Sequence, residues 1–314
     1  MLFVISYNNF GHNLLDVMFP AYVGMLEHQE HSEQPDLFAL NYEQAKSFGG
    51  WLELMFNNTF DLEQLLASKK EEGLVCFKKV IVGSPFGVTR SPPNKYYSKE
   101  RCKFTEEQNG FVAGRSTHMW MFRNHVLNKI LNSSSETLPS KHQITIFQKS
   151  GRRGVTNSEQ LASELKRVYE PEVRVVLSRP DLLSAREQME LLLNTTVLFS
   201  PCGAVSMTAV FLPPGATLIV TDFPGYQDSD LFTSDHMDAH VFNGLSWVRD
   251  LYYSIDSPEE FGKSGPLETP DPDSCLPDTS DYSLYRKYRD NAQITVKVDK
   301  LRTLIDHALY IMSN

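Results

Sequence analysis

The second half of the chain alternates short apolar runs with longer segments of helical period. The short runs have the length and β-branched content of strands. They are Gln143–Gln148, Val173–Leu177, Val197–Phe199 and the residues that follow Pro213-Pro214-Gly215. Two amphipathic segments and one apolar segment of helical length separate them. Strands joined by short helical connections predict an α/β fold with a parallel, doubly wound sheet and right-handed crossovers.

The amphipathic segments gather their apolar residues on one helical face. In the first segment, Asn157 and Ser158 are placed to cap a helix, and its apolar face consists of Leu161, Leu165 and Val168. The second segment is Ser184–Asn194. A final helix is expected at Val298–Met312, and its apolar face predicts that it packs across a domain. That face consists of Leu301, Leu304, Ile305, Ala308 and Met312.

A small-residue turn follows the third of these strands. Cys202, Gly203 and Ala204 come directly after Ser200-Pro201, and the apolar segment that ends at Pro213 begins there. If this segment is a helix, its first backbone N–H groups lack partners within the helix and favour an anion. Glycine and alanine would let a diphosphate approach the backbone closely. The alternative is an ordinary connection in which small residues let a helix pack on a strand.

A cationic loop follows the first strand. In Lys149–Asn157, three basic side chains flank Gly151 and Gly154; they are Lys149, Arg152 and Arg153. Ligands of doubly wound sheets lie beyond the carboxyl ends of the strands, where this loop and the small-residue turn both lie. The loop would therefore suit a diphosphate held from two sides. A solvated basic turn is the alternative.

The first 130 residues mix helical patterns with a strand. Helices are expected at Leu14–Leu26, Tyr42–Phe56, Leu62–Lys69 and Thr117–Leu131, and a strand at Leu74–Val82. The polar stretch 132–141 is the best domain boundary. We therefore predict an N-terminal αβ domain at 1–131, a linker at 132–141, a Rossmann-like domain at 142–297 and a C-terminal helix at 298–314.

Composition and charge exclude several classes of protein. The formal charge of −9 over 314 residues comes without a basic stripe and argues against a nucleic-acid partner. No stretch has the length and apolar character of a membrane span, and no signal peptide is visible. The four cysteines match no zinc pattern; a Cys76–Cys102 disulfide and reduced thiols are both open. Glycosylation sequons begin at Asn57, Asn132 and Asn194.

Four blocks in register resemble glycosyltransferase family 61. This family includes transferases that add N-acetylglucosamine to EGF domains or to O-mannose, and plant xylosyl- and arabinosyltransferases. The first block is Asn9 to Asp16 with His12 and Pro20, and the second is Val75-Cys76-Phe77 with the apolar strand after it. The third is Lys149, Arg153 and Asn157, and the fourth is Cys202-Gly203-Ala204-Val205-Ser206 before Pro213-Pro214-Gly215.

The resemblance implies a fold and a reaction. The fold is GT-B, with two Rossmann-like domains flanking a cleft. The reaction is inverting transfer of a sugar from a UDP-sugar to a hydroxyl of a protein or glycan. The transferred sugar that the resemblance favours is N-acetylglucosamine, or else a pentose such as xylose. The donor would be bound by the third and fourth blocks, namely by Lys149, Arg153, Asn157, Cys202, Gly203, Ala204, Val205 and Ser206.

His12 and Asp16 are the candidate catalytic base on the acceptor side. At positions i and i+4 of a helix they would share a face, and the carboxylate would fix the imidazole tautomer. The alternative is a pair that serves packing. Asn157 likewise has two possible roles, because it could cap a helix or contact the donor.

No metal ion or other cofactor is expected. Lys149, Arg153 and backbone N–H groups could stabilise a diphosphate by themselves. The Asp-x-Asp strings at Asp228 and Asp271 lie in polar stretches outside the sheet edge, where solvated charge explains them better.

Three departures from the family pattern leave a second function open. Cys202 stands in place of a histidine, Lys149 in place of an arginine, and the acidic residue after the next strand is missing, with Asp222 nearby. A thiol is a weaker donor than an imidazole, and lysine lacks the bidentate fork. The alternative function is a catalytically inactive GT-B-fold protein that binds nucleotide or carbohydrate.

Family members carry an anchor or signal before the region of resemblance. Because His12 lies so close to Met1, we expect an incomplete first domain. A longer form would act in the lumen of the Golgi or endoplasmic reticulum. Any membrane attachment would come through a segment absent from this chain.

Overall fold

The computed structural model divides the chain into two compact units. The first comprises residues 1–90, 117–134 and 184–189, and the second residues 91–116, 135–183 and 190–314. The structure describes residues 2–3, 11, 13–27, 37–39, 51, 59–68, 116–132, 137–149, 153–221, 223–227, 230–235, 242, 245–257, 260–262 and 293–313.

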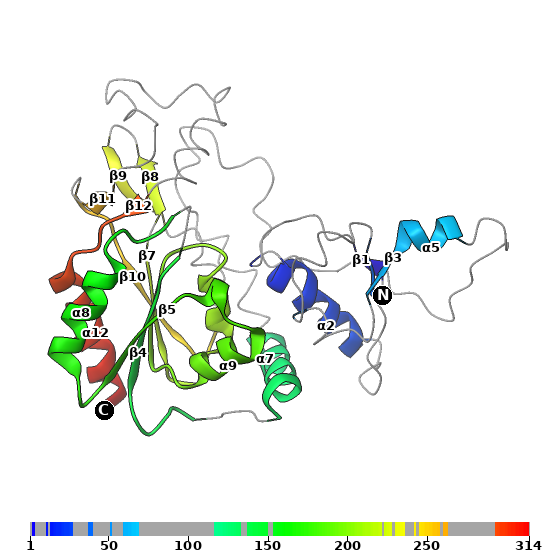
Figure 1. The fold of residues 1–314 in the computed structure, drawn as a ribbon, viewed down its shortest axis with the longest axis horizontal. Helices are drawn as coiled ribbons and strands as arrows, with labels where there is room; N and C mark the ends of the chain where they lie inside the picture. Colours follow the sequence, from blue (N-terminus) through cyan, green and yellow to red (C-terminus); the bar gives the residue numbers. More distant parts are fainter. Residues whose placement is uncertain are drawn as a thin grey trace. The chain divides into compact units, whose positions relative to one another are not determined.

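A five-stranded parallel sheet forms the centre of the second unit (Figure 1). Its order is β10-β7-β6-β4-β5, and every neighbouring pair is parallel. The strands are β4 (Gln143–Phe147), β5 (Arg174–Ser178), β6 (Val197–Ser200), β7 (Thr217–Thr221) and β10 (Arg249–Tyr253). The predicted parallel α/β sheet is confirmed, and β10 adds a fifth strand that the sequence pattern did not indicate.

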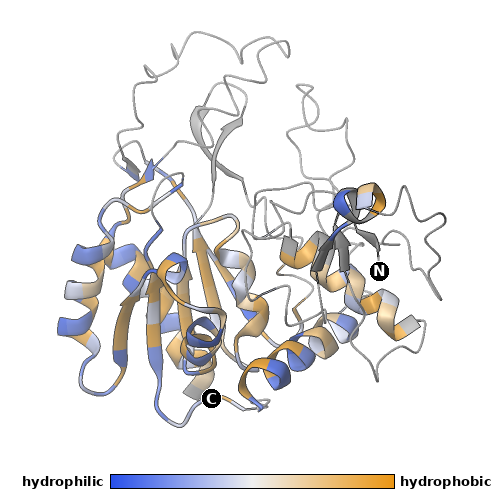
Figure 2. Ribbon diagram, turned by 45° about the vertical axis from the view of Figure 1, so that its right-hand side comes forward, coloured by the Kyte–Doolittle hydropathy of each residue, from blue (hydrophilic) through white to orange (hydrophobic). Residues whose placement is uncertain are grey.

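Helices α8 (Ser158–Tyr169) and α12 (Val298–Ser313) cover one face of this sheet (Figure 1). Ile146, Phe199 and Ile219 point into the core on this side, where they meet Leu165 of α8 and Ile305 of α12. The predicted final helix is thereby confirmed. Figure 2 shows apolar strands at the centre and polar residues on the outer sides of the helices.

The other elements between the strands are short. They are η3 (Pro180–Leu182), a 3₁₀ turn, α9 (Ala185–Leu193), and η4 (Ser206–Phe211), also 3₁₀. η4 lies on the sheet face opposite α8 and α12 (Figure 1). Its six residues are all buried.

The apolar face of α8 differs from the prediction at its last turn. Leu161 and Leu165 are buried, but Val168 is 43% exposed and Tyr169 takes the buried position. The Tyr169 hydroxyl donates a hydrogen bond to Asp306 of α12 at 2.7 Å. Tyrosine suits this position better than valine because its ring can be buried between α8 and α12 while its hydroxyl bonds a polar partner.

Asn157 stands where a helix cap was one of its two expected roles, but its side chain binds elsewhere. Asn157 occupies the N-cap position of α8, but its side chain makes no capping hydrogen bond. Its amide is bound instead to the backbone of Val296, with Nδ2–H to oxygen at 2.8 Å and N–H to Oδ1 at 3.0 Å.

The apolar segment before Pro213 is a six-residue 3₁₀ helix, not the longer helix the pattern favoured. Its hydrogen bonds run from Ser206 N–H to the Gly203 carbonyl at 2.9 Å and from Leu212 N–H to the Ala209 carbonyl at 3.0 Å. Leu212 is extended, with ψ of 150°, as a residue before proline prefers. So short a helix supplies little dipole, and the argument from a helix N-terminus falls away.

Two small antiparallel pairs complete the described part of the second unit. One is the hairpin of β8 (Phe223–Gln227) and β9 (Asp230–Asp235). The other pairs β11 (Phe261–Gly262) with β12 (Gln293–Ile294).

The first unit contains a small parallel sheet in the order β1-β2-β3. Its strands are β1 (Leu2–Phe3), β2 (Leu37–Ala39) and β3 (Thr59–Asp61). Its helices are η1 (Asn13–Met18), which is a π-helix, α2 (Phe19–Glu27), α5 (Leu62–Ser68) and α7 (Ser116–Leu131). The helices expected near Leu14, Leu62 and Thr117 are confirmed. The expected helix at Tyr42–Phe56, apart from Trp51, and the expected strand at Leu74–Val82 lie outside the described residues.

Aromatic contacts pack α2 against α7. The rings of Phe19 and Phe122 meet edge to face at 5.8 Å between centroids, and Tyr22 stacks at a tilt on His125 at 5.1 Å. Arg123 is fully buried in α7, with its guanidinium 4.7 Å from the Trp120 ring centre. Burial lowers the pKa of Arg123 to about 10, so it is still charged at neutral pH.

The helices described in both units are too short or too polar to cross a bilayer.

Candidate functional site

The order of the strands creates a switch point between β4 and β6. From β4 the chain passes to β5 on one side, and from β5 it returns past β4 to β6 on the other. The loops after β4 and β6 therefore leave neighbouring strands toward opposite faces of the sheet. In open α/β sheets, ligands bind in the crevice that such a divergence creates. The predicted cationic loop and the predicted small-residue turn flank this point.

The turn after β6 is held by hydrogen bonds on both sides. The Cys202 N–H donates to Thr221 Oγ1 at the end of β7, at 3.1 Å. The Gly203 carbonyl accepts from the Ser206 N–H at 2.9 Å and from its hydroxyl at 2.6 Å. Gly203 has a φ of +104°, a conformation that side chains with a Cβ rarely adopt. The backbone of this turn is therefore fixed in shape.

Arg153 lies directly over Gly203. A Cβ added to Gly203 would come within 3.0 Å of Arg153 Cζ and Nη2, and within 3.1 Å of Nη1. Only glycine leaves room for the guanidinium to rest on this turn. Arg153 itself has a φ of +57° and is 9% exposed. A planar cation with several N–H donors is thus built into the switch point.

The remaining donor-binding candidates fall into three groups. Lys149 lies two residues beyond the end of β4 and is half-buried at the same edge, and Ala204 and Val205 are half-buried in the turn. Cys202 and Ser206 are buried. Asn157 is bound to Val296, as described above, at the far end of the loop. Gly151 and Arg152 lie outside the described residues.

The structure says less about the candidate catalytic base. His12 lies outside the described residues, and Asp16 lies in η1, whose side-chain contacts at that position are not described. Their role as the catalytic base stays a prediction. Asp222, which stands near the missing acidic position of the family, also lies outside the described residues.

The structure describes one of the cysteines considered above and one residue of the Asp-x-Asp strings. Cys202 is buried and forms no disulfide, while Cys76 and Cys102 lie outside the described residues. Asp230 begins β9, and the rest of the Asp-x-Asp strings lies outside the described part of the chain. Among the residues that the structure does describe, no group of three or more histidine, cysteine or acidic side chains could hold a metal ion.

Sequence reasoning missed the residues that support this site. Thr221, which accepts the hydrogen bond of the Cys202 N–H, was not singled out by the sequence. The strand β10 and the buried Tyr253 at its end were not predicted either. Alternation of Leu251, Tyr253 and Ile255 was the available signal, because these three apolar positions repeat every second residue.

A parallel sheet with a cation and a fixed glycine turn at its switch point defines an α/β protein of the ligand-binding, doubly wound class. A family model described as glycosyltransferase 61 matches residues 10–219. The chain therefore belongs to glycosyltransferase family 61, as the four sequence blocks indicated, and is a sugar transferase by family. No curated protein sequence matches it.

Proposed function

We propose that the protein is an inverting glycosyltransferase that uses a UDP-sugar. It would transfer N-acetylglucosamine, or a pentose such as xylose, to a hydroxyl of a protein or glycan acceptor. The observation that carries this proposal is the contact between the Arg153 guanidinium and the Gly203 turn at the switch point. Family membership supports the reaction class, and this contact supports our proposal that the leaving group is bound at the switch point.

The reaction needs the departing UDP to be stabilised. The acceptor oxygen attacks the anomeric carbon, the bond from that carbon to the phosphate oxygen breaks, and UDP leaves with the electron pair. Arg153 can donate two parallel hydrogen bonds to a phosphate, and Lys149 adds a second positive charge at the same edge. These two cations can neutralise the leaving group without a divalent ion, so we propose a metal-independent reaction.

Proton removal is assigned to the acceptor side. His12 or Asp16 would take the hydroxyl proton as the acceptor attacks. A single displacement of this kind inverts the anomeric configuration. We further propose a glycoprotein or glycan acceptor and action within the secretory pathway, on the basis of the family.

Calorimetric titration with UDP tests the proposal directly. Arg153→Ala should weaken UDP binding by about 10- to 100-fold, the scale of a lost charge-assisted hydrogen-bond pair. Arg167→Ala is the matched control, because Arg167 is an exposed arginine of the same unit that pairs with Glu164 on α8. It should bind UDP as the wild type does. A wild-type protein that binds no UDP would overturn the proposal.

Turnover is tested with UDP-N-acetylglucosamine and UDP-xylose by following UDP release. Cys202→His then asks what the departure from the family pattern means. If the histidine raises UDP affinity or turnover, the cysteine weakens an ancestral function. If it lowers them, the buried thiol at 202 is an adaptation of this chain.

A further inference from the structure

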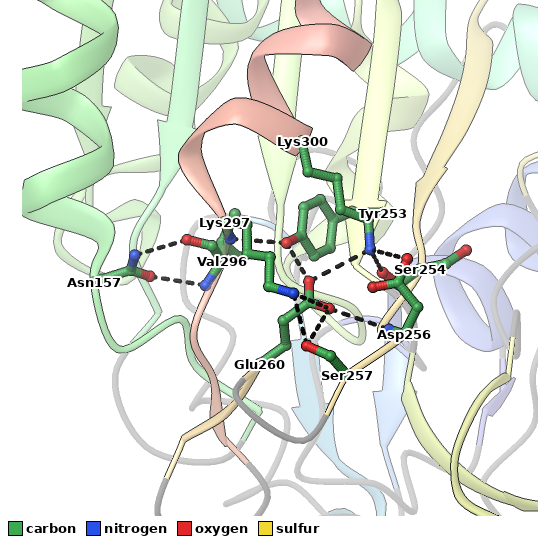
Figure 3. A network of polar contacts seen from close by, with 9 residues as sticks. All are labelled: Asn157, Tyr253, Ser254, Asp256, Ser257, Glu260, Val296, Lys297 and Lys300. Atoms are coloured by element: carbon green, nitrogen blue, oxygen red, sulfur yellow. Dashed lines mark hydrogen bonds and ion pairs between the residues drawn. The ribbon is translucent and has the colours of Figure 1, made fainter.

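A fully buried carboxylate lies beyond the end of β10. Glu260 is 0% exposed, and its Oε2 accepts hydrogen bonds from the Asp256 N–H at 3.2 Å and the Ser257 hydroxyl at 3.3 Å. Two ammonium groups neutralise it, with Lys300 Nζ 3.4 Å from Oε1 and Lys297 Nζ 3.8 Å from Oε2. Figure 3 shows these groups converging on the carboxylate.

Tyr253 joins this carboxylate to the chain that precedes α12. Its hydroxyl donates to Glu260 Oε1 and accepts the Lys297 N–H at 2.8 Å (Figure 3). The Glu260 carbonyl also accepts the Thr295 N–H at 2.7 Å. Burial and the hydrogen bond to Glu260 both raise the pKa of Tyr253, so the hydroxyl stays protonated at neutral pH. Residues 293–297, which we call the strap, are thus attached to a buried anchor.

The strap in turn holds the loop that carries Arg153. The Ile294 N–H donates to the Gly154 carbonyl at 2.9 Å, and the Ile294 carbonyl accepts the Thr156 N–H at 2.8 Å. The Asn157 amide pairs with the Val296 backbone through two further hydrogen bonds (Figure 3). Every residue from 154 to 157 except Val155 is tied to the strap by one of these bonds, and Val155 forms a parallel bridge with Ile294.

Arg153 is the residue directly before this tied segment. Its φ of +57° is uncommon for a residue with a side chain, and such conformations persist only where the surroundings impose them. The strap fixes the position of Gly154, and with it the chain on the C-terminal side of Arg153. If the strap loosens, Arg153 can relax to negative φ, and its guanidinium then leaves Gly203.

We propose that Tyr253 is a positioning residue, which holds Arg153 over Gly203 through the strap and thereby sets the affinity for the diphosphate of the donor. This inference rests on the proposed function. It adds a fully buried residue that lies beyond residue 219, outside the part of the chain that the family model matches.

Tyr253→Phe is the variant that tests it. It removes the hydroxyl but keeps the ring, which packs edge to face with Phe199 and lies 4.6 Å from Lys300 Nζ. Tyr169→Phe is the matched control, because it removes the hydroxyl of another buried tyrosine, one whose hydrogen bonds go to Asp306 and Arg302 of α12 and not to the strap or Glu260. Tyr253→Phe should weaken UDP binding about tenfold by calorimetry, and Tyr169→Phe should leave it within about twofold.

A double-mutant cycle separates positioning from a general loss of stability. In an Arg153→Ala background, Tyr253→Phe should cause no further loss of UDP affinity, since the group that it positions is already gone. An equal loss in both backgrounds, or no loss in either, would overturn the inference while leaving the proposed function intact. Failure of the wild-type protein to bind UDP would remove the proposed function itself, and this inference with it.

Hydrogen exchange tests the strap without any ligand. Amides 154–157 and 294–297 should exchange at least tenfold faster in Tyr253→Phe than in the wild type, and at the wild-type rate in Tyr169→Phe. Unchanged exchange in Tyr253→Phe would show that the strap does not depend on the tyrosine, and would overturn the inference whatever UDP does.

Discussion

The contact between Gly203 and Arg153 makes a sharp prediction for Gly203→Ala. Two effects follow from the added methyl group. Alanine at a φ of +104° is strained, and the methyl carbon would lie 3.0 Å from Arg153 Cζ. Because the arginine end is flexible, the guanidinium moves and the backbone stays in place.

The size of both effects can be worked from the structure. A side chain in a left-handed conformation costs about 1–3 kcal/mol, which lowers the melting temperature of a unit of this size by roughly 2–12 °C. Nonbonded carbons settle about 3.5–4.0 Å apart, so the guanidinium must retreat by about 0.5–1 Å. That retreat stretches a charge-assisted bond of about 2.8 Å beyond useful range. We expect UDP affinity to fall about tenfold.

Gly215→Ala is the control for strain alone. Gly215 has a φ of +85°, and its added methyl group would lie 3.2 Å from Leu138 Cδ1, away from Arg153. Thermal unfolding should show similar losses of stability for the two variants, whereas titration with UDP should show a loss only for Gly203→Ala. If Gly203→Ala binds UDP as the wild type does, the arginine over this turn has no part in binding.

Three further predictions concern stability. Thr221→Val removes the hydroxyl oxygen that accepts the hydrogen bond of the buried Cys202 N–H, and should lower the free energy of unfolding in urea by about 1–3 kcal/mol. A loss below about 0.5 kcal/mol would mean that this bond does not hold the turn. Leu165→Ala should cost about 2–5 kcal/mol and Val168→Ala under about 0.5 kcal/mol; equal costs would contradict the buried face that α8 shows. Burial, followed by a nearby lysine charge, lowers the pKa of His125 below its unfolded value of about 6.5, so the folded state binds fewer protons and stability should fall as the pH drops through 6.5. Urea unfolding at pH 7.5 and 5.5 should show a smaller fall for His125→Phe, and an unchanged fall would locate the titrating group elsewhere.

The sequence was sufficient for the centre of the second unit. Every residue of β4, β6 and β7 is buried because both faces of the sheet are covered, and their short runs rich in apolar and β-branched residues can be recognised without a structure. The two loops at the switch point could be anticipated for the same reason, since the topology brings the ends of neighbouring parallel strands together. Sequence reasoning could therefore bring the loop of Arg153 and the turn of Gly203 to the same edge of the sheet.

The missed features depend on contacts between distant residues. β10 begins with Arg249 and Asp250, whose charges hide its strand character until it is paired with β7. The hydrogen bonds of Asn157 reach across 139 residues to Val296, so a residue at a cap position gives no local sign of them. The length of η4 could not be predicted from its apolar residues alone. The hydrogen bond from the Ser206 hydroxyl to the Gly203 carbonyl tightens its first turn, and Pro213 ends it.

The edge strand β10 and the covering helix α12 both come after residue 219, where the match to the family ends. A recombinant fragment cut at that limit would end inside β7, would lack the neighbouring strand β10, and would leave Phe199 without its contact to Tyr253. Such a piece would be prone to aggregate through its open edge. Expression boundaries for this protein should therefore follow the sheet and extend through residue 313.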